Sequence, residues 1–385
     1  MAVVNRISAF AADMAAWRQH IHRNPELGMD CAQTAAYVAA RLREFGVDEV
    51  HEGVGGTGVV AVVKGRSEGP AIGLRADMDA LPILEATGSA SASEVPGRMH
   101  ACGHDGHTAM LLGAARYLAE TRNFAGSAVL IFQPGEEVGQ GAKAMVEDGL
   151  MDRFGIASVY GLHTDPSAEL GVLATRPGPM MAAVDFWEIH ITGRSCHAAH
   201  PEMGVDPVAA AVQIASALQT ILTRNISALN QAVLSITKIQ SGDAFNVVPE
   251  TALLGGTVRT HQGATRDLIE RRMGEIAESV GKAMGVETSV NYMRRTQILE
   301  NDAASVELAL RAMEDVAGSD GVKEAPQIMG GEDFSEMLMA RPGAFVRLGQ
   351  GKGPSLHNDH FEFNDAAAPV GASFLVRLVE TAQPA

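Results

Sequence analysis

Short apolar segments that alternate with segments of helical periodicity most constrain the fold of this 385-residue chain. VVAVVKG (59–65), AIGLRAD (71–77) and SAVLIFQP (127–134) are predicted to be buried strands, and residues 107–120 have the periodicity of a helix. SVYGLHT (158–164) is predicted to be a further strand. Because short apolar strands separated by helices are typical of βα units, we predict an α/β fold with a mostly parallel sheet flanked by helices.

The pattern changes at RPGPMMA (176–182), where two prolines interrupt it. The following residues predict a strand, a long helix, two strands, a second helix and a final strand, which is the order of a split βαβ, ferredoxin-like α+β domain. Strands expected near 326–329 and 344–349 then return to the first pattern, in which short apolar strands are separated by helices. The predicted organisation is a discontinuous domain at 1–180 and 292–385 and an inserted smaller domain at 181–291.

Charge and cysteine content exclude several classes of protein. The formal net charge of −16 argues against a nucleic-acid partner, because neutralising phosphates requires clustered Lys and Arg. The first residues do not have the pattern of a secretory signal, and no apolar run approaches the roughly 20 residues of a membrane span. Cys31, Cys102 and Cys196 are too few and too scattered for a disulfide framework. We therefore predict a cytoplasmic protein without a membrane partner.

The octapeptide HACGHDGH (100–107) is the densest group of metal-binding and proton-transferring side chains in the chain. We expect an extended backbone here, which would send Cys102 and His104 to the same face, within reach of one ion. On this interpretation Asp105 points the other way and His107 begins the next helix. The alternative is a polar loop at a helix N-terminus around a buried structural cysteine.

Three further polar clusters follow predicted strands, where α/β sheets place their sites. Glu136 and Glu137 lie just beyond one strand, and one glutamate can hold a metal while the other acts as a base. His163 ends another apolar strand, and a loop near the C-terminus supplies His357 and His360. Alone, the glutamates are more typical of a solvated helix N-terminus, and a single strand-end histidine is typically structural. Together, these clusters favour a site assembled from several strand ends.

Seven motifs, taken in order, resemble a known family. They are LRADMDALP (74–82), MHACGHDGHTA (99–109), FQPGEE (132–137), GLH (161–163), NVVPE with GGTVRT (246–260), GGEDFS (330–335) and LHN with FNDAA (356–367). This series resembles the aminoacylase/carboxypeptidase metallopeptidase family. The chain is most similar to the branch that holds hippurate hydrolase and the plant hydrolases of auxin–amino acid conjugates. The resemblance covers nearly the whole chain.

The resemblance implies a two-metal amidohydrolase with a catalytic domain and an inserted lid that also forms a dimer. Glu136 would be the general acid/base. The thiolate, imidazole and carboxylate donors of the implied site suit zinc, manganese, cobalt or nickel, and the sequence does not choose among these metals. Carried over motif by motif, the metal ligands would be Cys102, His104, Glu137, His163 and His357.

Four more residues near these motifs are expected to orient the ligands rather than to bind metal. They are Asp77, Asp79, Asp105 and His107. In other branches of the family a histidine ligand stands at the position of Asp77, so this chain departs from that pattern. His100 has no assigned role.

The inserted domain carries three candidate residues. GRSCHAAHP (193–201) fits the family pattern of a histidine that reaches across a dimer, which implies that His197 hydrogen-bonds the oxyanion in the neighbouring active site. Asn246 and Arg259 match positions that contact substrate in relatives, and a planar guanidinium suits a free α-carboxylate. Without the resemblance, His197 is a surface loop residue and Arg259 a solvated edge charge. Cys196 stands where the branch commonly has glycine, which we interpret as neutral variation, with a reactive thiol as the alternative.

The implied reaction is cleavage of the amide bond of an N-acyl amino acid, such as an N-acetyl or N-benzoyl derivative, to a carboxylic acid and a free amino acid. The implied assembly is a homodimer or a higher homo-oligomer formed through the lid. Departures from the branch at four positions near the proposed site are expected to affect substrate choice: Thr164, Asp165, Asp359 and Glu362.

Two other functions remain open. One is a metallodipeptidase or carboxypeptidase of the same fold, which would need a pocket for the free amine of its substrate. The other is a non-catalytic binding protein, against which the intact set of candidate metal and acid/base residues argues. A thiol hydrolase built on Cys102 and His104 is disfavoured, because side chains two residues apart on an extended chain project in parallel.

Overall fold

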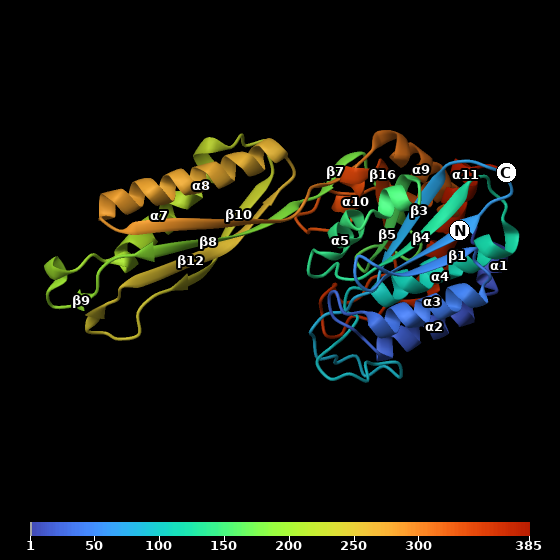
Figure 1. Ribbon diagram of the computed structural model, residues 1–385, viewed down its shortest axis with the longest axis horizontal. Coiled ribbons are helices and arrows are strands. Elements are labelled where there is room, and N and C mark those ends of the chain that lie inside the picture. The colour runs from blue at the N-terminus through green and yellow to red at the C-terminus, as the bar shows by residue number, and fades with distance from the viewer. Residues whose placement is uncertain (1) are drawn as a thin grey trace. The chain divides into compact units, whose positions relative to one another are not determined.

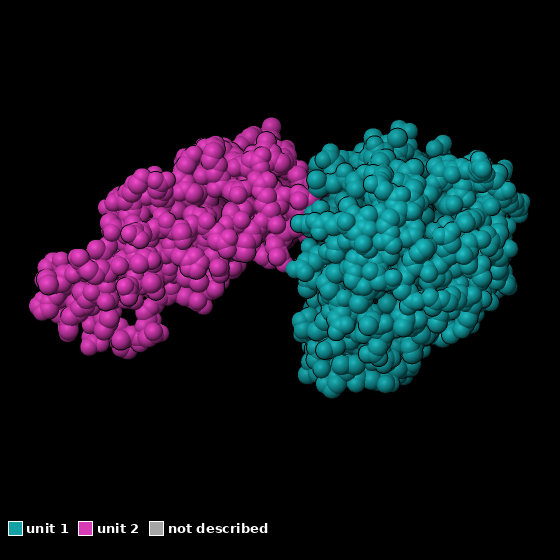
Figure 2. Space-filling model, viewed as in Figure 1, with its two compact units in different colours: residues 1–180, 300–326, 333–385 teal, residues 181–299, 327–332 magenta. Residues whose placement is uncertain are grey.

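The computed structural model describes residues 2–385, which form two compact units (Figure 2). Both ends of the chain build unit 1. No helix within the described residues has the length and hydropathy needed to cross a membrane. Unit 1 comprises Met1–Met180, Glu300–Pro326 and Asp333–Ala385, and unit 2 comprises Met181–Leu299 and Gln327–Glu332.

An eight-stranded mixed sheet forms the centre of unit 1, in the order β1-β2-β4-β3-β5-β16-β6-β15 (Figure 1). The four central strands β4, β3, β5 and β16 are parallel neighbours, so their carboxyl ends lie at one edge. Every residue of β3 is buried, which accounts for its nearly continuous apolar sequence. The bounds are β1 Glu49–Val54, β2 Gly58–Lys64, β3 Ala71–Asp77, β4 Ser127–Gln133, β5 Ile156–Asp165, β6 Leu173–Thr175, β15 Val322–Glu324 and β16 Gly343–Gly349.

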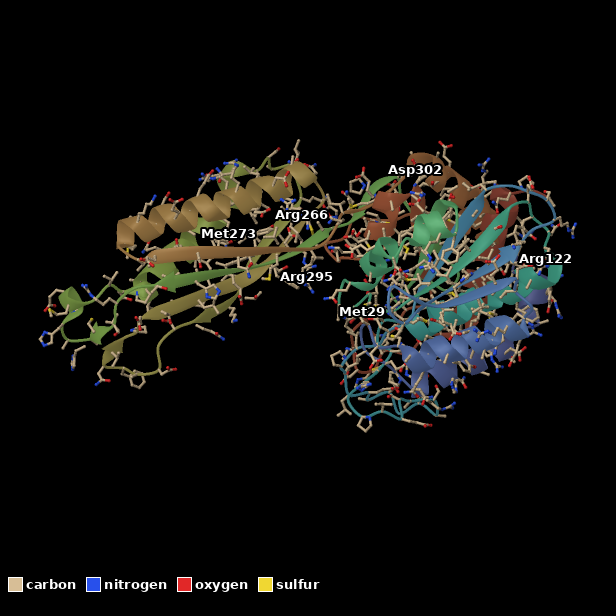
Figure 3. The ribbon with its side chains drawn as sticks, viewed as in Figure 1. Met29, Arg122, Arg266, Met273, Arg295 and Asp302 are labelled. Carbon is tan, nitrogen blue, oxygen red and sulfur yellow. The ribbon has the colours of Figure 1, made fainter. Side chains whose placement is uncertain are left out.

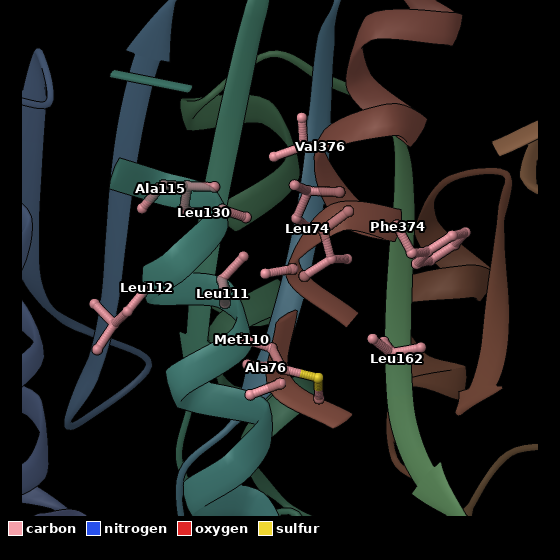
Figure 4. Close-up of a cluster of buried hydrophobic side chains, with 14 of the residues drawn as sticks. Leu74, Ala76, Met110, Leu111, Leu112, Ala115, Leu130, Leu162, Phe374 and Val376 are labelled. Carbon is pink, nitrogen blue, oxygen red and sulfur yellow. The ribbon is translucent and has the colours of Figure 1, made fainter. Parts of the chain in front are cut away.

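Helices of unit 1 pack on this sheet. Leu74 and Ala76 of β3 belong to the same hydrophobic cluster as Met110 of α4 (Figure 4). Because alternate strand residues face opposite sides, Arg75 projects to the other face, where it contacts Asp333, just before α10. The helices are α1 Asn5–Ser8, α2 Ala11–Arg23, α3 Ala32–Glu44, α4 His104–Thr121, α5 Gly141–Glu147, α6 Leu150–Arg153, α9 Ala303–Ala317, α10 Ser335–Ala340 and α11 Ala368–Ala382, with 3₁₀ turns η3 Ser319–Gly321 and η4 Asp365–Ala367.

The prediction of a strand near residues 326–329 was wrong. The strand that joins the sheet is β15, which ends at Glu324, and Ile328 makes only an isolated bridge to Met181. Pro326 explains the difference, because proline has no backbone N–H to contribute to a ladder of hydrogen bonds.

Unit 2 contains a four-stranded antiparallel sheet, in the order β10-β12-β8-β13, on which α7 and α8 pack. Asp206 caps α7 by accepting from the N–H groups of Val208 and Ala209. Arg266 lies on α8 (Figure 3). It forms a buried ion pair with Asp185 of β8. The elements are β8 Ala183–Thr192, β9 Cys196–His197, η1 Pro201–Met203, α7 Pro207–Thr220, the π-helix η2 Ile221–Asn225, β10 Ala232–Gln240, β11 Val247–Val248, β12 Thr251–Thr260, α8 Gly263–Met284 and β13 Glu287–Thr296, and β7 Gly178–Met181 pairs with β14 Leu299–Asn301.

Candidate metal centre

The carboxyl ends of three adjacent parallel strands carry the polar residues that the sequence singled out. Asp77 is the last residue of β3, His163 lies near the end of β5, and β4 ends at Gln133, shortly before the two glutamates. The first turn of α4 faces this edge, because Thr108 donates a hydrogen bond to the carbonyl of Asp77 (2.9 Å). The order β4-β3-β5 therefore gathers residues that are far apart in the sequence.

The backbone of the octapeptide differs from the extended chain that we expected. Gly103 has a φ of 83° and precedes α4, which begins at His104 rather than at His107. A Cβ on Gly103 would lie 2.7 Å from Cγ2 of Thr164, so only glycine fits this left-handed turn. A Cβ on Gly106 would lie 2.3 Å from the ring of Phe363. The two glycines thus let the start of α4 approach the ends of neighbouring segments.

His104 is fully buried among acidic groups. Its Nε2 lies 3.7 Å from Asp77, 3.9 Å from Glu137 and 4.0 Å from Glu136 (nearest carboxylate oxygens). Its Nδ1 lies 3.4 Å from an oxygen of Asp79. Neither nitrogen makes a hydrogen bond of acceptable geometry within residues 2–385. Burial disfavours protonation, but Asp77, Cys102 and Asp79 together outweigh it and raise the pKa of His104 well above its usual value.

Cys102 and His163 face each other across the turn. The Sγ atom of Cys102 lies 3.4 Å from Nε2 of His163. Nδ1 of His163 donates to the carbonyl of Thr164 (2.8 Å), so Nε2 is the nitrogen left with a lone pair. This arrangement directs a sulfur and an imidazole nitrogen to the same point.

Both ring nitrogens of His107 make hydrogen bonds to other residues. The N–H of Thr164 donates to Nε2 (2.9 Å), so this nitrogen carries no proton. Nδ1 must then donate to Asp77, at 2.6 Å. A histidine held in this way has no lone pair to offer a metal. Its place between β3, α4 and β5 is that of a residue that orients its neighbours.

Asp79 holds the turn that carries the two glutamates. Its carboxylate oxygens accept from the N–H groups of Glu136 (3.0 Å) and Glu137 (3.1 Å). Glu137 lies 3.4 Å from Nε2 of His357, and its Oε1 is buried without a hydrogen bond among residues 2–385. His357 adopts a left-handed conformation with a φ of 62°, and its N–H donates to the carbonyl of Ala101 (2.8 Å). A strained backbone of this kind is typical of functional sites.

The ligand atoms of these residues form overlapping groups, in each of which all atoms lie within 4.8 Å of one another. Thiolate, imidazole and carboxylate donors together match the preferences of transition metals such as zinc. The buried nitrogens of His104 and the unbonded oxygen of Glu137 fit such an ion, because buried polar atoms are seldom left unsatisfied. The groups are Cys102–His104–His163, Cys102–Glu137–His357 and His104–Glu136–Glu137. Atoms of Asp77, His104 and His107 lie equally close together, but hydrogen bonds occupy both nitrogens of His107.

Other predicted residues lie apart from these groups. Asp105 faces away from them and contacts His22 and Arg18 of α2. His100 is buried, and its ring nitrogens have no hydrogen bond within the described chain. Burial lowers the pKa of His100 to about 3, although the charge of Asp105 opposes the shift. His360 is exposed beside Asp359.

The three candidates in unit 2 occupy two separate places. His197 of β9 pairs with Val247 of β11, and the N–H of Ala198 donates to the carbonyl of Asn246 (3.0 Å). Arg259 lies near the other end of β12, in register with Val184 of β8. Unit 2 therefore brings His197 and Asn246 together and leaves Arg259 elsewhere.

Asp77 belongs to a buried polar network whose other members, Arg75, Gln133 and Asp333, were not expected from the sequence. Arg75 bonds Gln133 (2.8 Å), Asp77 (2.6 Å) and Asp333 (3.2 Å), and Asp333 accepts from the N–H of Ala142 (2.9 Å). A charged residue inside an otherwise apolar strand was the available signal, because such residues are almost never buried unless paired.

Comparisons with known proteins agree with this geometry. A family profile described as "Peptidase family M20/M25/M40" matches residues 73–381. An N-acetyl-L-cysteine deacetylase of Bacillus subtilis is 39% identical over 96% of this chain and 88% of its own length. A hippurate hydrolase of Campylobacter jejuni is 39% identical over 94% of each chain. A solved structure of a Bacillus subtilis dinuclear metal-binding peptidase superimposes with a TM-score of 0.86 at 34% identity, covering 97% of this chain and 98% of the other.

Proposed function

The chain belongs to peptidase family M20/M25/M40, and from this premise we propose that it is a metal-dependent hydrolase that cleaves the amide bond of N-acyl amino acids. The products would be a carboxylic acid and a free amino acid. The observation that carries the proposal is the meeting of thiol, imidazole and carboxylate donors at the carboxyl edge of the sheet. Relatives named for N-acetylcysteine and hippurate, both N-acyl amino acids, support this substrate class.

Two divalent metal ions are proposed for the overlapping groups, which the dinuclear structural relative supports. When bound, such ions would supply Lewis acidity, the chemistry that activates water and polarises a carbonyl. His107 and Asp79 would keep the ligands in place through the hydrogen bonds described above. The proposed ligands are Cys102, His104, Glu137, His163 and His357.

Glu136 is the proposed general acid/base. Its backbone is fixed by Asp79, while its side chain reaches to 4.0 Å from Nε2 of His104 and keeps 12% of its surface exposed. A carboxylate in this position can take a proton from an attacking water and give it to the leaving amine. Its neighbour Glu137 is directed instead toward His357.

Two side chains of unit 2 are proposed to act on the substrate. His197 accepts a hydrogen bond from the N–H of Ala199 at Nδ1 (3.0 Å), so its neutral form carries the proton on Nε2 and can donate to an oxyanion. Arg259 is half-buried and makes no hydrogen bond or ion pair within residues 2–385, so its guanidinium can receive a carboxylate. Burial lowers the pKa of Arg259 because the guanidinium is incompletely hydrated, and an anionic partner would stabilise such a charge.

A homodimer or larger homo-oligomer, formed through residues 181–291 as a lid, is proposed from the spacing within unit 2. Eight residue steps separate Thr251, near the hairpin of His197 and Asn246, from Arg259. At about 3.3 Å per residue, that is roughly 26 Å along β12. One small N-acyl amino acid cannot contact both ends, so Asn246 and Arg259 would reach one substrate only from different copies.

A catalytic domain of residues 1–180 and 292–385 completes the proposal, together with a cytoplasmic location. The free thiols of Cys31, Cys102 and Cys196 support that location, because reducing compartments keep cysteines unpaired.

The test is a matched pair of substitutions at adjacent positions, Glu136→Gln and Glu137→Gln, in protein loaded with zinc, manganese, cobalt or nickel. Glu136→Gln is expected to lower kcat by at least about a hundredfold while both metals stay bound, because only the acid/base is lost. Glu137→Gln is expected to lose metal. Substrates are N-acetyl and N-benzoyl amino acids, with unblocked dipeptides to detect a peptidase. Full turnover by Glu136→Gln would refute its role, and no hydrolysis of any N-acyl amino acid with any metal would refute the proposed function.

A further inference from the structure

Two residues of α2, Arg18 and His22, contact Asp105, the residue that follows His104. Arg18 and His22 lie one helical turn apart and therefore project from the same face of α2. Nδ1 of His22 lies 2.8 Å from Oδ2 of Asp105, and Arg18 donates to the same oxygen at 3.2 Å. The other oxygen of Asp105 is buried without a hydrogen bond among residues 2–385. The side chain of Asp105 is thus anchored through α2.

The second nitrogen of His22 contacts Glu85, whose Oε2 lies 3.2 Å from Nε2. All three side chains of this Asp105–His22–Glu85 chain are at most 5% exposed. An ionised carboxylate only accepts hydrogen bonds, so an imidazole between two carboxylates donates from both nitrogens and is positively charged. Burial disfavours this charge, but Asp105 and Glu85 outweigh it and raise the pKa of His22 to about 9.

Glu85 organises the loop between β3 and α4. It accepts from the N–H of Ser93 (2.7 Å) and from the hydroxyl of Thr87. The next residue, Ala86, donates its N–H to the carbonyl of Asp359 (2.8 Å). The folded loop is therefore bonded to the segment that carries His357, two residues before Asp359.

His22 thus stands between two segments that supply proposed metal ligands. On one side, Asp105 fixes the first turn of α4, which begins with His104. On the other side, Glu85 shapes the loop that holds the His357 segment. We propose, on the basis of the proposed function, that His22 and Glu85 are positioning residues that keep His104 and His357 at the spacing that two metal ions require. Neither residue belongs to the groups of candidate ligand atoms.

The test compares His22→Gln and Glu85→Gln with His20→Gln in the full chain. His20 is exposed on the same helix, where its ring stacks on Tyr37, so its replacement is a matched control. Three quantities are measured well below the melting temperature: cobalt(II) affinity by competition with a chelator, the visible spectrum of the cobalt-loaded protein, and the Tm of the metal-free protein. The cobalt spectrum reports ligand geometry, which a purely structural role would leave unchanged.

We expect His22→Gln to weaken cobalt binding by roughly tenfold and to change the cobalt spectrum, as outer-shell substitutions do. Glu85→Gln should produce a smaller change in the same direction, and His20→Gln should match the wild type. A lower Tm with unchanged affinity and spectrum would overturn the proposal. If His22→Gln does not fold, the cobalt affinity, cobalt spectrum and Tm of Glu85→Gln test the proposal instead. A wild-type protein that binds none of cobalt, zinc, manganese or nickel would refute the proposed function itself, whereas normal binding by both variants would refute only the positioning role.

Discussion

Gly103→Ala is the substitution for which the structure gives the clearest physical expectation. Gly103 lies between two proposed ligands and has a φ of 83°. An added Cβ would lie 2.7 Å from Cγ2 of Thr164, a distance that real Cβ contacts do not show. Thr164 cannot rotate away freely, because it is fully buried and its hydroxyl donates to Gln350 (3.0 Å).

Two costs add in this variant. Left-handed backbone costs a residue with a Cβ roughly 1–2 kcal/mol. Overpacking a buried contact costs about 1–3 kcal/mol more. We therefore expect the free energy of unfolding to fall by about 2–5 kcal/mol. Metal affinity should fall as well, because the carbonyl of Thr164 orients His163 and its N–H orients His107.

Gly97→Ala is the matched control. Gly97 belongs to the same connection and has a φ of 78°, but an added Cβ there would meet nothing within 4 Å. It should show only the conformational cost and normal metal affinity. Urea unfolding of the metal-free variants and chelator competition with zinc measure both effects. Equal losses of stability in the two variants, or normal zinc affinity in Gly103→Ala, would refute the reasoning.

Two further predictions concern buried charges. Arg266→Met should lower the stability of unit 2 by about 3–5 kcal/mol, because Asp185 is fully buried and would lose its ion-pair partner. The double variant that also carries Asp185→Asn should recover part of this loss, measured by urea unfolding. Equal stability of the single and double variants would contradict the explanation. The pKa of His22 is raised from 6.5 to about 9, so its stabilisation is complete below pH 6.5 and is lost as the pH rises through 9. The difference in unfolding free energy between wild type and His22→Gln should therefore shrink by about 3 kcal/mol over that interval, and a constant difference would contradict the prediction.

The fold class was predictable because it depends on patterns that the sequence displays directly. Strands buried on both faces are apolar along their length, as in β3, and the carboxyl ends of parallel strands meet at one edge. That rule was enough to expect Glu136, Glu137 and His163 in one place, and each of them shares one of the overlapping groups of ligand atoms with Cys102 or His104. The direction of the parallel strands was therefore enough to predict which of these residues lie at the candidate site.

The local backbone was less predictable. The extended conformation expected at 102–104 was wrong, since a left-handed glycine and the start of α4 bring Cys102 and His104 together instead. Both conformations place the two side chains close together, so the spacing of the two residues in the sequence could not distinguish the conformations. The requirement for glycine arises from Thr164, a residue 61 positions later that no local pattern connects with Gly103.

Residue type alone also could not assign roles within the octapeptide. His104 and His107 are both buried histidines of one helical turn, yet the N–H of Thr164 and the carboxylate of Asp77 occupy both nitrogens of His107. His104 keeps both nitrogens without such hydrogen bonds within the described chain and is surrounded by carboxylates. The difference in hydrogen bonding between these two histidines is therefore set by partners from β3 and β5. A substitution of Thr164 that moves its backbone should change the role of His107, although the two residues are 57 positions apart.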